Sequence, residues 1–461
     1  MPKVQKPLSR EKLSRLLKKN GTAVHFIGIG GVSMYSLARL SQSLGLSVSG
    51  SDRVLGEYAH DLISRGVRVH AGHDGPHAAG AELVVYSFAI REDNPELIYA
   101  VEHDIPTVSR AEYLGALMKD YGTRIGVSGS HGKSTTTALI DAIFYEAGRE
   151  NTTLLGASLV GGTPLREGGT DTMIYEACEY KDAFLHFHPT IAVALNLELD
   201  HTDYFSCLGE IKESFRRALS RAERFALVNA DDENLASVIK GLKAPVITYG
   251  QGTRSTYRFL ICDFLERGFR FVLYKHGQRI GDFTLNIPGV FNVGNAAAAV
   301  IVALECGIPL ETVQKAVASF RGIPRRLEYI GERFGRPVFY DYAHHPTEIA
   351  ASINAVKLMT HGLVTVVFKP HTYSRTRSLW EGFRLSLGIA DYILLPPIYP
   401  AREEPIHGTS SDRLALELGE HARAVDDYRV TEELDSFTHG AIIIMGAGDM
   451  ENIKHDVIYK P

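Results

Sequence analysis

The stretch IGVSGSHGKSTTTAL, Ile125–Leu139, places a glycine-rich segment between an apolar run and a helix-like run. The common phosphate-loop pattern requires a glycine five residues before the glycine of G-K-[ST], and this chain has Val127 there. The physical requirements are still met, because the strand-like RIGVSG leads into a loop that opens the helix-like STTTALIDAIFYEAG. Free backbone N–H groups converge at such a helix start and bind anions. The stretch therefore predicts a phosphate-binding loop within an α/β fold.

The residue types in this loop suit ATP in particular. Gly129 and Gly132 let the backbone approach the phosphates closely, and Lys133 can reach the β- and γ-phosphates. The Ser134 hydroxyl can bind Mg²⁺. The alternative is a glycine turn in which Ser134 only caps the helix, and the G-K-S-T context favours the nucleotide.

Bulk composition narrows the class of protein. A chain of 461 residues predicts about three domains, and its 45% hydrophobic and 22% charged content is typical of a globular protein. The net charge of -5, without a long basic run, argues against a nucleic-acid partner. The four cysteines are far apart, so neither a disulfide framework nor a zinc site is predicted. We find no signal peptide and no apolar run of membrane-spanning length, and we expect a cytoplasmic protein without a membrane partner.

Strand-like and helix-like segments alternate in three regions, which predicts parallel sheets covered by helices. The boundaries are placed near Lys119 and Ile323, giving domains 1–118, 119–323 and 324–461. The strand-like segments of the first region are residues 23–31, 46–52, 82–90 and 105–114, with a helix over 32–45. Those of the second are 123–128, 171–179, 191–200 and 224–231, with an antiparallel hairpin over 257–277 and a helix over 295–307. Those of the third are 335–343, 363–371, 390–400 and 439–449.

A second glycine loop, GIGGVS from Gly28 to Ser33, nearly matches G-x-G-x-x-G, with Ser33 at the third glycine position. Asp52 ends the next predicted strand, where dinucleotide-binding folds place an acidic residue on a ribose. Three interpretations stay open at this point. The loop faces a nucleotide diphosphate, it serves a dehydrogenase, or it is only a tight strand–helix turn.

Acidic and imidazole side chains follow two further predicted strands near the phosphate loop. Glu176 and Glu179 lie in YEACEYKDAF, and Asp200, His201 and Asp203 lie in NLELDHTDYF. Carboxylates at strand ends beside phosphates suit Mg²⁺ and water. An isolated histidine is more often structural, but the loop nearby favours a functional interpretation of His201.

The third region carries cationic groups on irregular segments that follow apolar strands. Such groups attract carboxylates and phosphates, although a solvated charged loop remains the alternative for each. They are His344 and His345 beside Asp341 in DYAHHPTE, and His371, Arg375 and Arg377 in KPHTYSRTR.

Taken in order, these segments resemble those of the Mur ligases over nearly the whole chain. The matching motifs are HFIGIGGVSM, SGSD, FAIREDNPE, GSHGKSTTT, EACEY, NLELDH, PGVFNVGNAAAA, RRLE, DYAHHPTE, PHTYSRTR, IYPAREEPI and MGAG. In this family the phosphate loop is itself G-x-x-G-K-[ST]-T, which fits Gly129 to Thr135. The resemblance implies an ATP-dependent amide ligase that joins L-alanine to UDP-N-acetylmuramate through an acyl phosphate. It also implies a UDP-binding domain, a central ATPase and a Rossmann-like third domain that closes over the ATP site.

The resemblance also implies roles for individual residues. UDP would face Gly28, Gly30, Gly31, Ser33 and Asp52. ATP would bind Gly129, Ser130, His131, Gly132, Lys133, Ser134 and Thr135, with Asn292, Asn295, Arg326 and Asp341 contacting the rest of the nucleotide. One Mg²⁺ ion would be held by Ser134 and Glu176, and a second by His201. Lys133, Glu176 and His201 would then be the catalytic residues. The amino acid and acyl group would face His344, His345, His371, Arg375 and Arg377.

Two segments depart from the family's common pattern. Phe291 stands where a histidine usually precedes the first asparagine, which predicts different contacts to adenine. EACEYKD replaces the usual EADESD, and Glu179 competes with Glu176 as a magnesium ligand. Lys212, the candidate for the modified lysine of sister ligases, is left out of the site.

Alternative functions are a ligase that attaches a preformed peptide to UDP-N-acetylmuramate, an NAD-dependent oxidoreductase, and a non-catalytic nucleotide switch. PHTYSRTR and the GIGG loop favour L-alanine over the peptide. The oxidoreductase leaves the second loop and NLELDH unexplained. The joint presence of Lys133, Glu176 and His201 argues against a switch.

Overall fold

The computed structural model describes residues 8–159, 162–201, 204–401, 403–437 and 439–459, so that Asp203 lies outside the described residues. By its internal contacts the chain divides into two units. The first comprises Met1–Arg258 with Ala298–Val313, and the second comprises Phe259–Ala297 with Gln314–Pro461. The described residues form three β-sheets, of five, ten and six strands, and the predicted α/β class with parallel sheets is confirmed.

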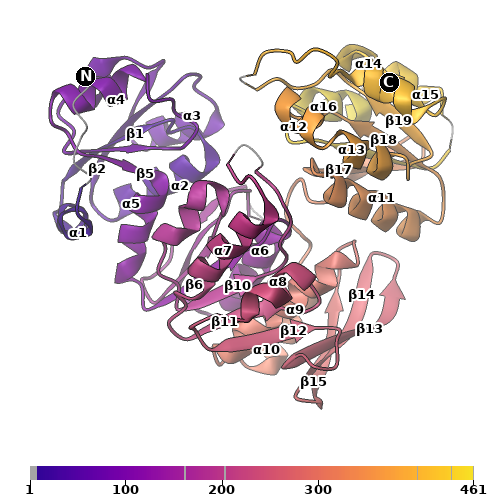
Figure 1. The fold of residues 1–461 in the computed structure, drawn as a ribbon, viewed down its shortest axis with the longest axis horizontal. Coiled ribbons are helices and arrows are strands. Elements are labelled where there is room, and N and C mark those ends of the chain that lie inside the picture. The colour runs from indigo at the N-terminus through magenta and orange to yellow at the C-terminus, as the bar shows by residue number, and fades with distance from the viewer. Residues whose placement is uncertain (1–7, 160–161, 202–203, 402, 438, 460–461) are drawn as a thin grey trace. The chain divides into compact units, whose positions relative to one another are not determined.

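The first sheet lies in the first unit and has the strand order β3-β2-β1-β4-β5, with parallel pairs between all its neighbouring strands. Figure 1 labels β1, β2 and β5 of this sheet. The order reverses between β1 and β4, where open parallel sheets bind ligands. The strands are β1 (Ala23–Ile27), β2 (Ser47–Asp52), β3 (Arg68–Ala71), β4 (Leu83–Tyr86) and β5 (Thr107–Ser109). The helices are α1 (Arg10–Lys18), α2 (Val32–Ser43), α3 (Glu57–Ser64), α4 (Pro95–Glu102) and α5 (Arg110–Leu117), with the 3₁₀-helices η1 (Gly75–Ala78) and η2 (Met118–Asp120).

The strand predicted over residues 105–114 is wrong in its second half. Strand β5 ends at Ser109, and α5 begins at the next residue. Ser109 Oγ accepts the Glu112 N–H at 3.2 Å, and Glu112 Oε2 accepts the Ser109 N–H at 2.8 Å. These reciprocal bonds form a capping box, whose S-x-x-E pattern is the signal that the strand prediction overlooked.

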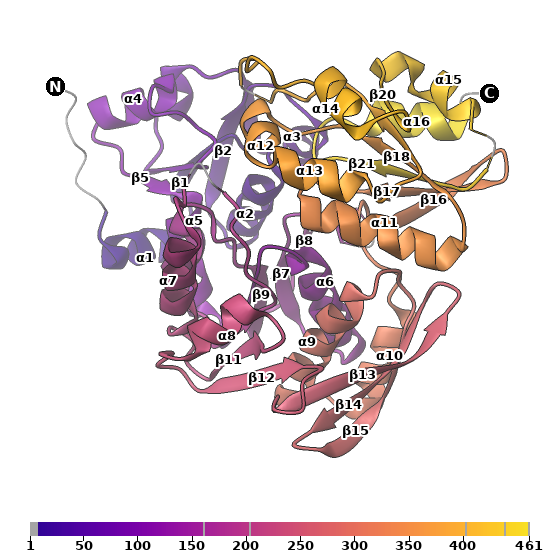
Figure 2. The same ribbon diagram turned by 45° about the vertical axis from the view of Figure 1, so that its right-hand side comes forward.

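The second sheet has the order β15-β14-β13-β12-β11-β10-β6-β9-β7-β8. Strand β6 pairs in parallel with both β10 and β9, so the segments that follow these three strands emerge at one edge of the sheet. Figure 2 shows α6 beside β7 and β9, which it packs against. The strands of the first unit are β6 (Thr123–Ser128), β7 (Asn151–Leu154), β8 (Leu165–Arg166), β9 (Thr172–Glu176), β10 (Ile191–Ala194), β11 (Phe225–Asn229) and β12 (Val246–Gly250). The helices are α6 (Lys133–Glu146), α7 (Leu208–Leu219) and α8 (Glu233–Ile239), with the 3₁₀-helix η3 (Tyr180–His186).

The predicted hairpin over residues 257–277 is present and gains a third strand. The strands are β13 (Tyr257–Leu265), β14 (Gly268–Lys275) and β15 (Gln278–Leu285), and β14 pairs antiparallel with β15. His276 and Gly277 have φ values of +47° and +80°, which suit the two-residue turn of a tight hairpin. Helices α9 (Phe291–Glu305) and α10 (Leu310–Ser319) follow, and α9 begins four residues before the predicted helix.

The third sheet lies in the second unit and has the order β16-β17-β21-β18-β19-β20. Only the β16–β17 pair is antiparallel among its described pairs. The strands are β16 (Glu328–Arg333), β17 (Arg336–Asp341), β18 (Val364–Phe368), β19 (Tyr392–Leu395), β20 (Ala422–Ala424) and β21 (Ala441–Met445). The helices are α11 (Pro346–Thr360), α12 (Tyr373–Ser378), α13 (Trp380–Leu387), α14 (Ser411–Leu418), α15 (Val430–Asp435) and α16 (Glu451–Tyr459), with the 3₁₀-helix η4 (Asp427–Arg429).

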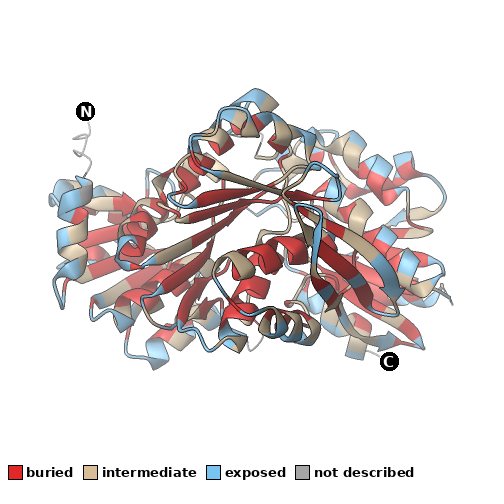
Figure 3. Ribbon diagram, turned by 90° about the horizontal axis from the view of Figure 1, so that it is seen from below, coloured by how far each residue is buried: buried red, intermediate tan, exposed pale blue. Residues whose placement is uncertain are grey.

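The strands form the cores of both units, and the outward faces of the helices are exposed (Figure 3). Every residue of β18 and β21 is buried, as expected for central strands covered on both faces. The four cysteines are free, in agreement with the sequence prediction. Within the described part of the chain, no helix is both long and apolar enough to cross a membrane.

Candidate active site

The phosphate loop connects β6 to α6 in the first unit. Gly129 and Gly132 have φ values of +146° and +83°, a region that residues with a Cβ rarely adopt. A Cβ on Gly129 would also lie 3.1 Å from the Cβ of Leu195. Gly132 is the N-cap of α6 and offers no side chain to the first turn. The N–H groups of that turn, together with the positive end of the helix dipole, therefore favour an anion in the loop.

Asn196, which follows β10, holds the loop from one side. Its Oδ1 accepts the His131 N–H at 2.8 Å, and its Nδ2 donates to the His131 carbonyl at 3.0 Å. The Asn196 carbonyl accepts the Ser130 N–H at 3.3 Å. This one residue thus fixes the tip of the loop before any ligand binds.

Lys133 forms a buried ion pair with Glu179. Its Nζ lies 3.2 and 3.3 Å from the two Glu179 carboxylate oxygens, and it also donates to the carbonyls of Gly129 and Ser130. The Glu179 side chain is fully buried. Burial lowers the pKa of the Lys133 ammonium, but the charges of Glu179, Cys178 and Glu176 and the hydrogen bond to Glu179 together outweigh burial and leave that pKa above its ordinary value. The ammonium therefore stays charged at the mouth of the loop.

His201 lies on the other side of the same carboxylate. Its Nε2 is 3.7 Å from Glu179 Oε1 and 3.9 Å from Asp200 Oδ2. Its backbone has a φ of +54°, and its N–H donates to Asp200 Oδ1 at 2.6 Å. The Tyr180 ring lies 4.7 Å from the imidazole, centroid to centroid. The predicted pair of Lys133 and His201 is thus brought together around Glu179.

Glu176 has a different environment. It ends β9, and its Oε1 accepts the Gly156 N–H at 2.7 Å. Its carboxylate is only half-buried, in contrast to that of Glu179. Ser134 and Thr135 are buried in the first turn of α6. Oxygen donors are therefore present both on the loop and at the end of β9, as a magnesium site at phosphates requires.

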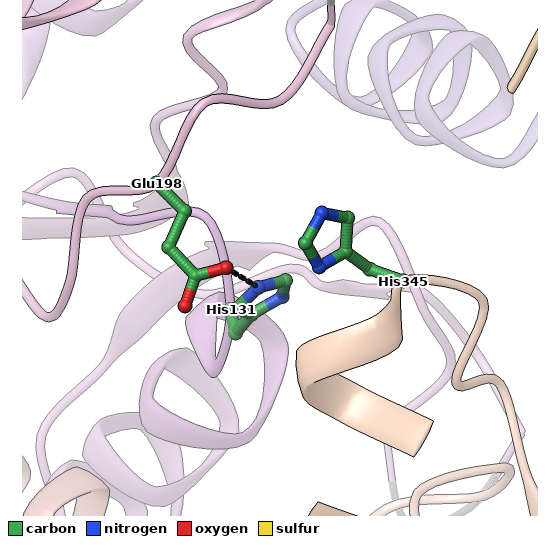
Figure 4. Close-up of side chains that lie close together, drawn as sticks. All are labelled: His131, Glu198 and His345. Atoms are coloured by element: carbon green, nitrogen blue, oxygen red, sulfur yellow. Dashed lines mark hydrogen bonds and ion pairs between the residues drawn. The ribbon is translucent and has the colours of Figure 1, made fainter. Parts of the chain in front are cut away.

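His131, in the loop itself, contacts a second carboxylate. Figure 4 shows its ring beside the Glu198 side chain, with Nε2 3.4 Å from Oε2. Glu198 is also tied to the loop through its backbone, because its N–H donates to Ser130 Oγ at 2.9 Å. The segment after β10 thus contacts the loop through both backbone and side chains.

The first glycine loop connects β1 to α2. Gly28 has a φ of +81°, and the N–H groups of Gly28 and Ile29 donate to the Ser51 carbonyl at 2.8 and 3.0 Å. The Gly30 N–H donates to Asp52 Oδ2 at 2.9 Å, and a Cβ on Gly30 would lie only 3.0 Å from that oxygen. Asp52 therefore holds the loop directly.

Gly31 is the N-cap of α2 and makes no side-chain cap. Ser33 lies in the first turn of that helix, half-buried. The first turn of α2 therefore presents free N–H groups, as the first turn of α6 does.

In the second unit, Asn292 and Asn295 lie on the first turns of α9. Asn295 Nδ2 donates to Asn292 Oδ1 at 2.9 Å, and Asn292 Nδ2 donates to the Pro288 carbonyl at 2.6 Å. Both side chains are buried, whereas Phe291 is 45% exposed. The two amides thus share one site, and the ring that replaces the usual histidine faces solvent.

The positive charge of Arg326 acts on the Asp341 carboxyl, whose pKa it lowers against the larger effect of burial. Arg326 NH1 is 3.8 Å from Glu348 Oε1, and its guanidinium lies 5.3 Å from the Tyr342 ring centroid. The neighbours of Arg326 in the chain, Arg325 and Leu327, both have positive φ values, +61° and +47°. Arg326 therefore lies between two residues whose backbone conformation is uncommon for residues with a Cβ.

Of the five residues predicted to face the amino acid and acyl group, four make side-chain contacts within the second unit. His371 Nδ1 lies 3.4 Å from Arg375 NH1, and the His344 ring contacts Glu348 at 3.4 Å. His345 caps α11, where its Nδ1 accepts the Thr347 N–H at 3.4 Å. Burial, aided by the charge of Arg375, lowers the pKa of His371 to about 4, so its ring is neutral at pH 7.

Arg377 does not join this group, since its side chain on α12 is exposed. Burial also lowers the pKa of His344, against the opposing charge of Glu348.

Family models match the chain in three consecutive segments. The "Mur ligase family, catalytic domain" matches residues 23–122, the "Mur ligase middle domain" residues 127–303, and the "Mur ligase, glutamate ligase domain" residues 325–452. The chain belongs to the Mur ligase family. The predicted resemblance is thereby confirmed.

Among curated relatives of this Mur ligase are UDP-N-acetylmuramate–L-alanine ligases. That of Clostridium novyi (strain NT) is 38% identical over 447 residues, covering 95% of this chain and 97% of the relative. That of Caldicellulosiruptor saccharolyticus is 40% identical over 435 residues, covering 92% and 95%. The solved UDP-N-acetylmuramate–alanine ligase of Thermotoga maritima has a TM-score of 0.79 and 25% identity, covering 94% of this chain and 98% of that one. The murein peptide ligase of Psychrobacter arcticus 273-4, at 23% identity and a TM-score of 0.72, shares the fold, covering 95% and 98%.

Sequence analysis of this Mur ligase missed two residues of the loop's surroundings. Asn196 and Glu198 both lie in NLELDH, in which only Asp200 and His201 were predicted to be functional. The signal that could have found Asn196 is its position, since an amide directly after a strand adjacent to the loop strand can satisfy loop N–H groups. Glu198 has no comparable signal, because its contact depends on the loop conformation.

The buried Asp341 makes the stability of this Mur ligase depend on pH. Burial raises the pKa of its carboxyl to about 6, from an ordinary 3.8, although Ser352 and Arg326 oppose this rise. Between these pH values the unfolded chain has lost the proton and the folded protein still holds it. The free energy of unfolding therefore falls as pH rises from about 4 to 6, by about 3 kcal/mol in total, and stays lower above that range.

Asp341→Asn keeps the shape of this side chain and removes its charge. We expect the variant to unfold at a higher urea concentration than the wild type at pH 8 and at nearly the same concentration at pH 3.5, where Asp341 is protonated in the folded protein and mostly protonated in the unfolded chain. Asp412→Asn, at an exposed aspartate of α14, is the matched control and should change neither midpoint. Equal midpoints for Asp341→Asn and wild type at pH 8 would contradict the burial of a charge at this position.

Proposed function

We propose that this Mur ligase joins L-alanine to the lactyl carboxylate of UDP-N-acetylmuramate, using ATP, in peptidoglycan precursor synthesis. The observation that carries the proposal is the charged Lys133, held by Glu179 at the mouth of a loop that opens α6. Its support in relatives is the identity of 38 to 40% to two ligases of that name over more than nine-tenths of the chain.

The chemistry explains why such a ligase needs a phosphate loop. A carboxylate does not condense with an amine at neutral pH, because hydroxide is a poor leaving group. In the proposed reaction a carboxylate oxygen attacks the γ-phosphorus, the bond to the β,γ-bridging oxygen breaks, and ADP leaves with the electron pair. The uncharged amine of L-alanine then forms the C–N bond, phosphate leaves with its electron pair, and the nitrogen loses a proton.

The residues of the first unit would serve the first step. Lys133 and the N–H groups of the first turn of α6 would bind the phosphoryl oxygens and offset the charge that develops on them. The hard donors Ser134 Oγ and Glu176 fit one Mg²⁺, and His201 is assigned to a second. Bound Mg²⁺ would neutralise negative charge on the phosphates.

Binding of the substrates is assigned to three further groups. The diphosphate of the UDP moiety would bind the first turn of α2 and the loop from Gly28 to Gly31. The adenosine part of ATP would contact Asn292, Asn295, Arg326 and Asp341. The amino acid and acyl group would face His344, His345, His371 and Arg375, and the exposed Arg377 would contribute charge alone.

The proposal is tested by phosphate release with ATP, Mg²⁺ and UDP-N-acetylmuramate across a panel of amino acids and peptides. Release with L-alanine alone is the expected result. Release only with a preformed peptide would replace the proposal by the peptide-attaching ligase. Equal release with glycine, L-serine and L-alanine would remove the amino-acid assignment. Binding of a nicotinamide dinucleotide in place of UDP would favour the oxidoreductase.

A further inference from the structure

One face of the first sheet carries a buried polar network beside a small apolar cluster. Glu96 on α4 is fully buried, as is His25 on β1. Glu96 Oε2 lies 2.6 Å from His25 Nε2, and Glu96 Oε1 lies 2.7 Å from His73 Nδ1. The Ser51 hydroxyl donates to the same carboxylate, at 2.7 and 2.9 Å from its two oxygens. The apolar cluster on this face contains few fully buried residues: Ile27, Ala78, Val84 and Ala100.

The donors and acceptors of this network follow from the carboxylate. Burial would raise the pKa of Glu96, but the hydrogen bonds from His25, Ser51 and His73 outweigh it and lower that pKa below its ordinary value. An ionised carboxylate only accepts, so His25 Nε2 and His73 Nδ1 donate to it. The other ring nitrogen, His25 Nδ1, contacts the Ser49 hydroxyl at 3.0 Å. Glu96 is thus the shared acceptor on which the network depends.

Other titratable groups face the network from the strand and helix beside it. The rings of His70, on β3, and His77, on η1, stack at a centroid distance of 4.2 Å. Burial lowers the pKa of His70, and the neighbouring His77, His25 and Arg68 lower it further. A neutral His70 adds no cation beside Glu96 at pH 7, so the carboxylate relies on its hydrogen bonds.

Ser51 connects this network to the first glycine loop. Its hydroxyl binds Glu96, and its carbonyl accepts the N–H groups of Gly28 and Ile29. The next residue, Asp52, accepts the Gly30 N–H. The end of β2 is therefore held by α4 on one side and holds the glycine loop on the other.

We propose that Glu96 is a positioning residue for the UDP-substrate loop. Through Ser51 it fixes the end of β2, and with it the glycine loop that leads into the first turn of α2, whose free N–H groups would bind the diphosphate. This inference rests on the assignment of the glycine loop to UDP in the proposed function. Glu96 itself touches no substrate.

Glu96→Gln tests the inference, because the amide has the same shape but replaces one acceptor oxygen with a donor. At least one of the three donors then faces an N–H group, and the end of β2 shifts. We expect the KM for UDP-N-acetylmuramate to rise about tenfold while kcat and the KM values for ATP and L-alanine stay within about twofold. Glu102→Gln, at an exposed carboxylate of the same helix, is the matched control and should leave all four constants unchanged.

Ser51→Ala provides a second route if Glu96→Gln folds poorly. It removes the hydroxyl that binds Glu96 and keeps the carbonyl that binds the loop. We expect Ser51→Ala to raise the KM for UDP-N-acetylmuramate selectively. In the double variant Glu96→Gln/Ser51→Ala, the factor by which this KM rises should be smaller than the product of the factors for the two single variants, because both substitutions break the same contact. A general loss of kcat, of all KM values and of thermal stability would show a purely structural role and overturn the inference. An unchanged KM for UDP-N-acetylmuramate in both single variants would overturn it as well.

Calorimetric binding of UDP separates this inference from the proposed reaction. If the wild type binds UDP but ligates no L-alanine, the proposed function fails. In that case about tenfold weaker UDP binding by Glu96→Gln would still support the positioning role. Absence of UDP binding by the wild type would overturn both.

Discussion

Replacing Lys133 by alanine is expected to lower the rate of ligation about a thousandfold or more. The lysine supplies a full positive charge at the mouth of the phosphate loop, and its ion pair with Glu179 keeps the ammonium protonated. No neighbouring helix N–H group can replace that charge on the transferred phosphoryl group. Phosphate release with ATP, UDP-N-acetylmuramate and L-alanine measures the loss. Calorimetry should show that UDP binding is largely retained, because the first glycine loop is untouched.

A second effect of this substitution must be separated from the first. Lys133→Ala leaves the buried Glu179 carboxylate without its ammonium partner, which costs about 3–5 kcal/mol of stability. The double variant Lys133→Ala/Glu179→Gln removes that unpaired charge, so it should regain thermal stability without regaining activity. Lys212→Ala on α7 is the control for loss of a lysine outside the loop. Near-normal turnover of a stable Lys133→Ala variant would refute the assignment of this loop to ATP.

The sequence predicted most where backbone geometry follows from local patterns. Alternation of strands and helices predicted parallel sheets in three regions, and both glycine loops connect a strand to a helix as predicted. Local patterns also account for two errors. The S-x-x-E capping box turned residues 110–117 into a helix, and the His276–Gly277 turn added β15 to the hairpin.

The site was harder to predict because its contacts join segments that are distant along the chain. Glu176 and Glu179 are the same residue type three positions apart, and only the 3₁₀-helix after β9 determines which one reaches Lys133. Lys181 and Asp182 in that segment have positive φ values, which no residue pattern there suggested. The Glu96 network is equally hidden in the sequence, since His25, Ser51, His73 and Glu96 meet only through the order of the strands.

The final prediction concerns the different roles of the Glu176 and Glu179 carboxylates. Glu179 is fully buried and has both oxygens within 3.3 Å of Lys133 Nζ, so its charge is already compensated. Glu176 uses Oε1 for the Gly156 N–H and is half-buried, which leaves Oε2 as the better placed magnesium ligand. We therefore expect Glu176→Gln to lower kcat about a hundredfold and to raise the Mg²⁺ concentration for half-maximal rate about tenfold.

Glu179→Gln should behave differently, because its carboxylate holds Lys133 and not the ion. It is expected to weaken ATP binding and lower kcat, with the Mg²⁺ concentration for half-maximal rate unchanged. Titration of Mn²⁺ by electron paramagnetic resonance, with a non-hydrolysable ATP analogue present, gives the same comparison without turnover. Glu233→Gln, at an exposed carboxylate of α8, is the control for loss of a negative charge. A raised Mg²⁺ requirement in Glu179→Gln alone would exchange the two roles, making the buried carboxylate the ligand and Glu176 a structural acceptor for Gly156.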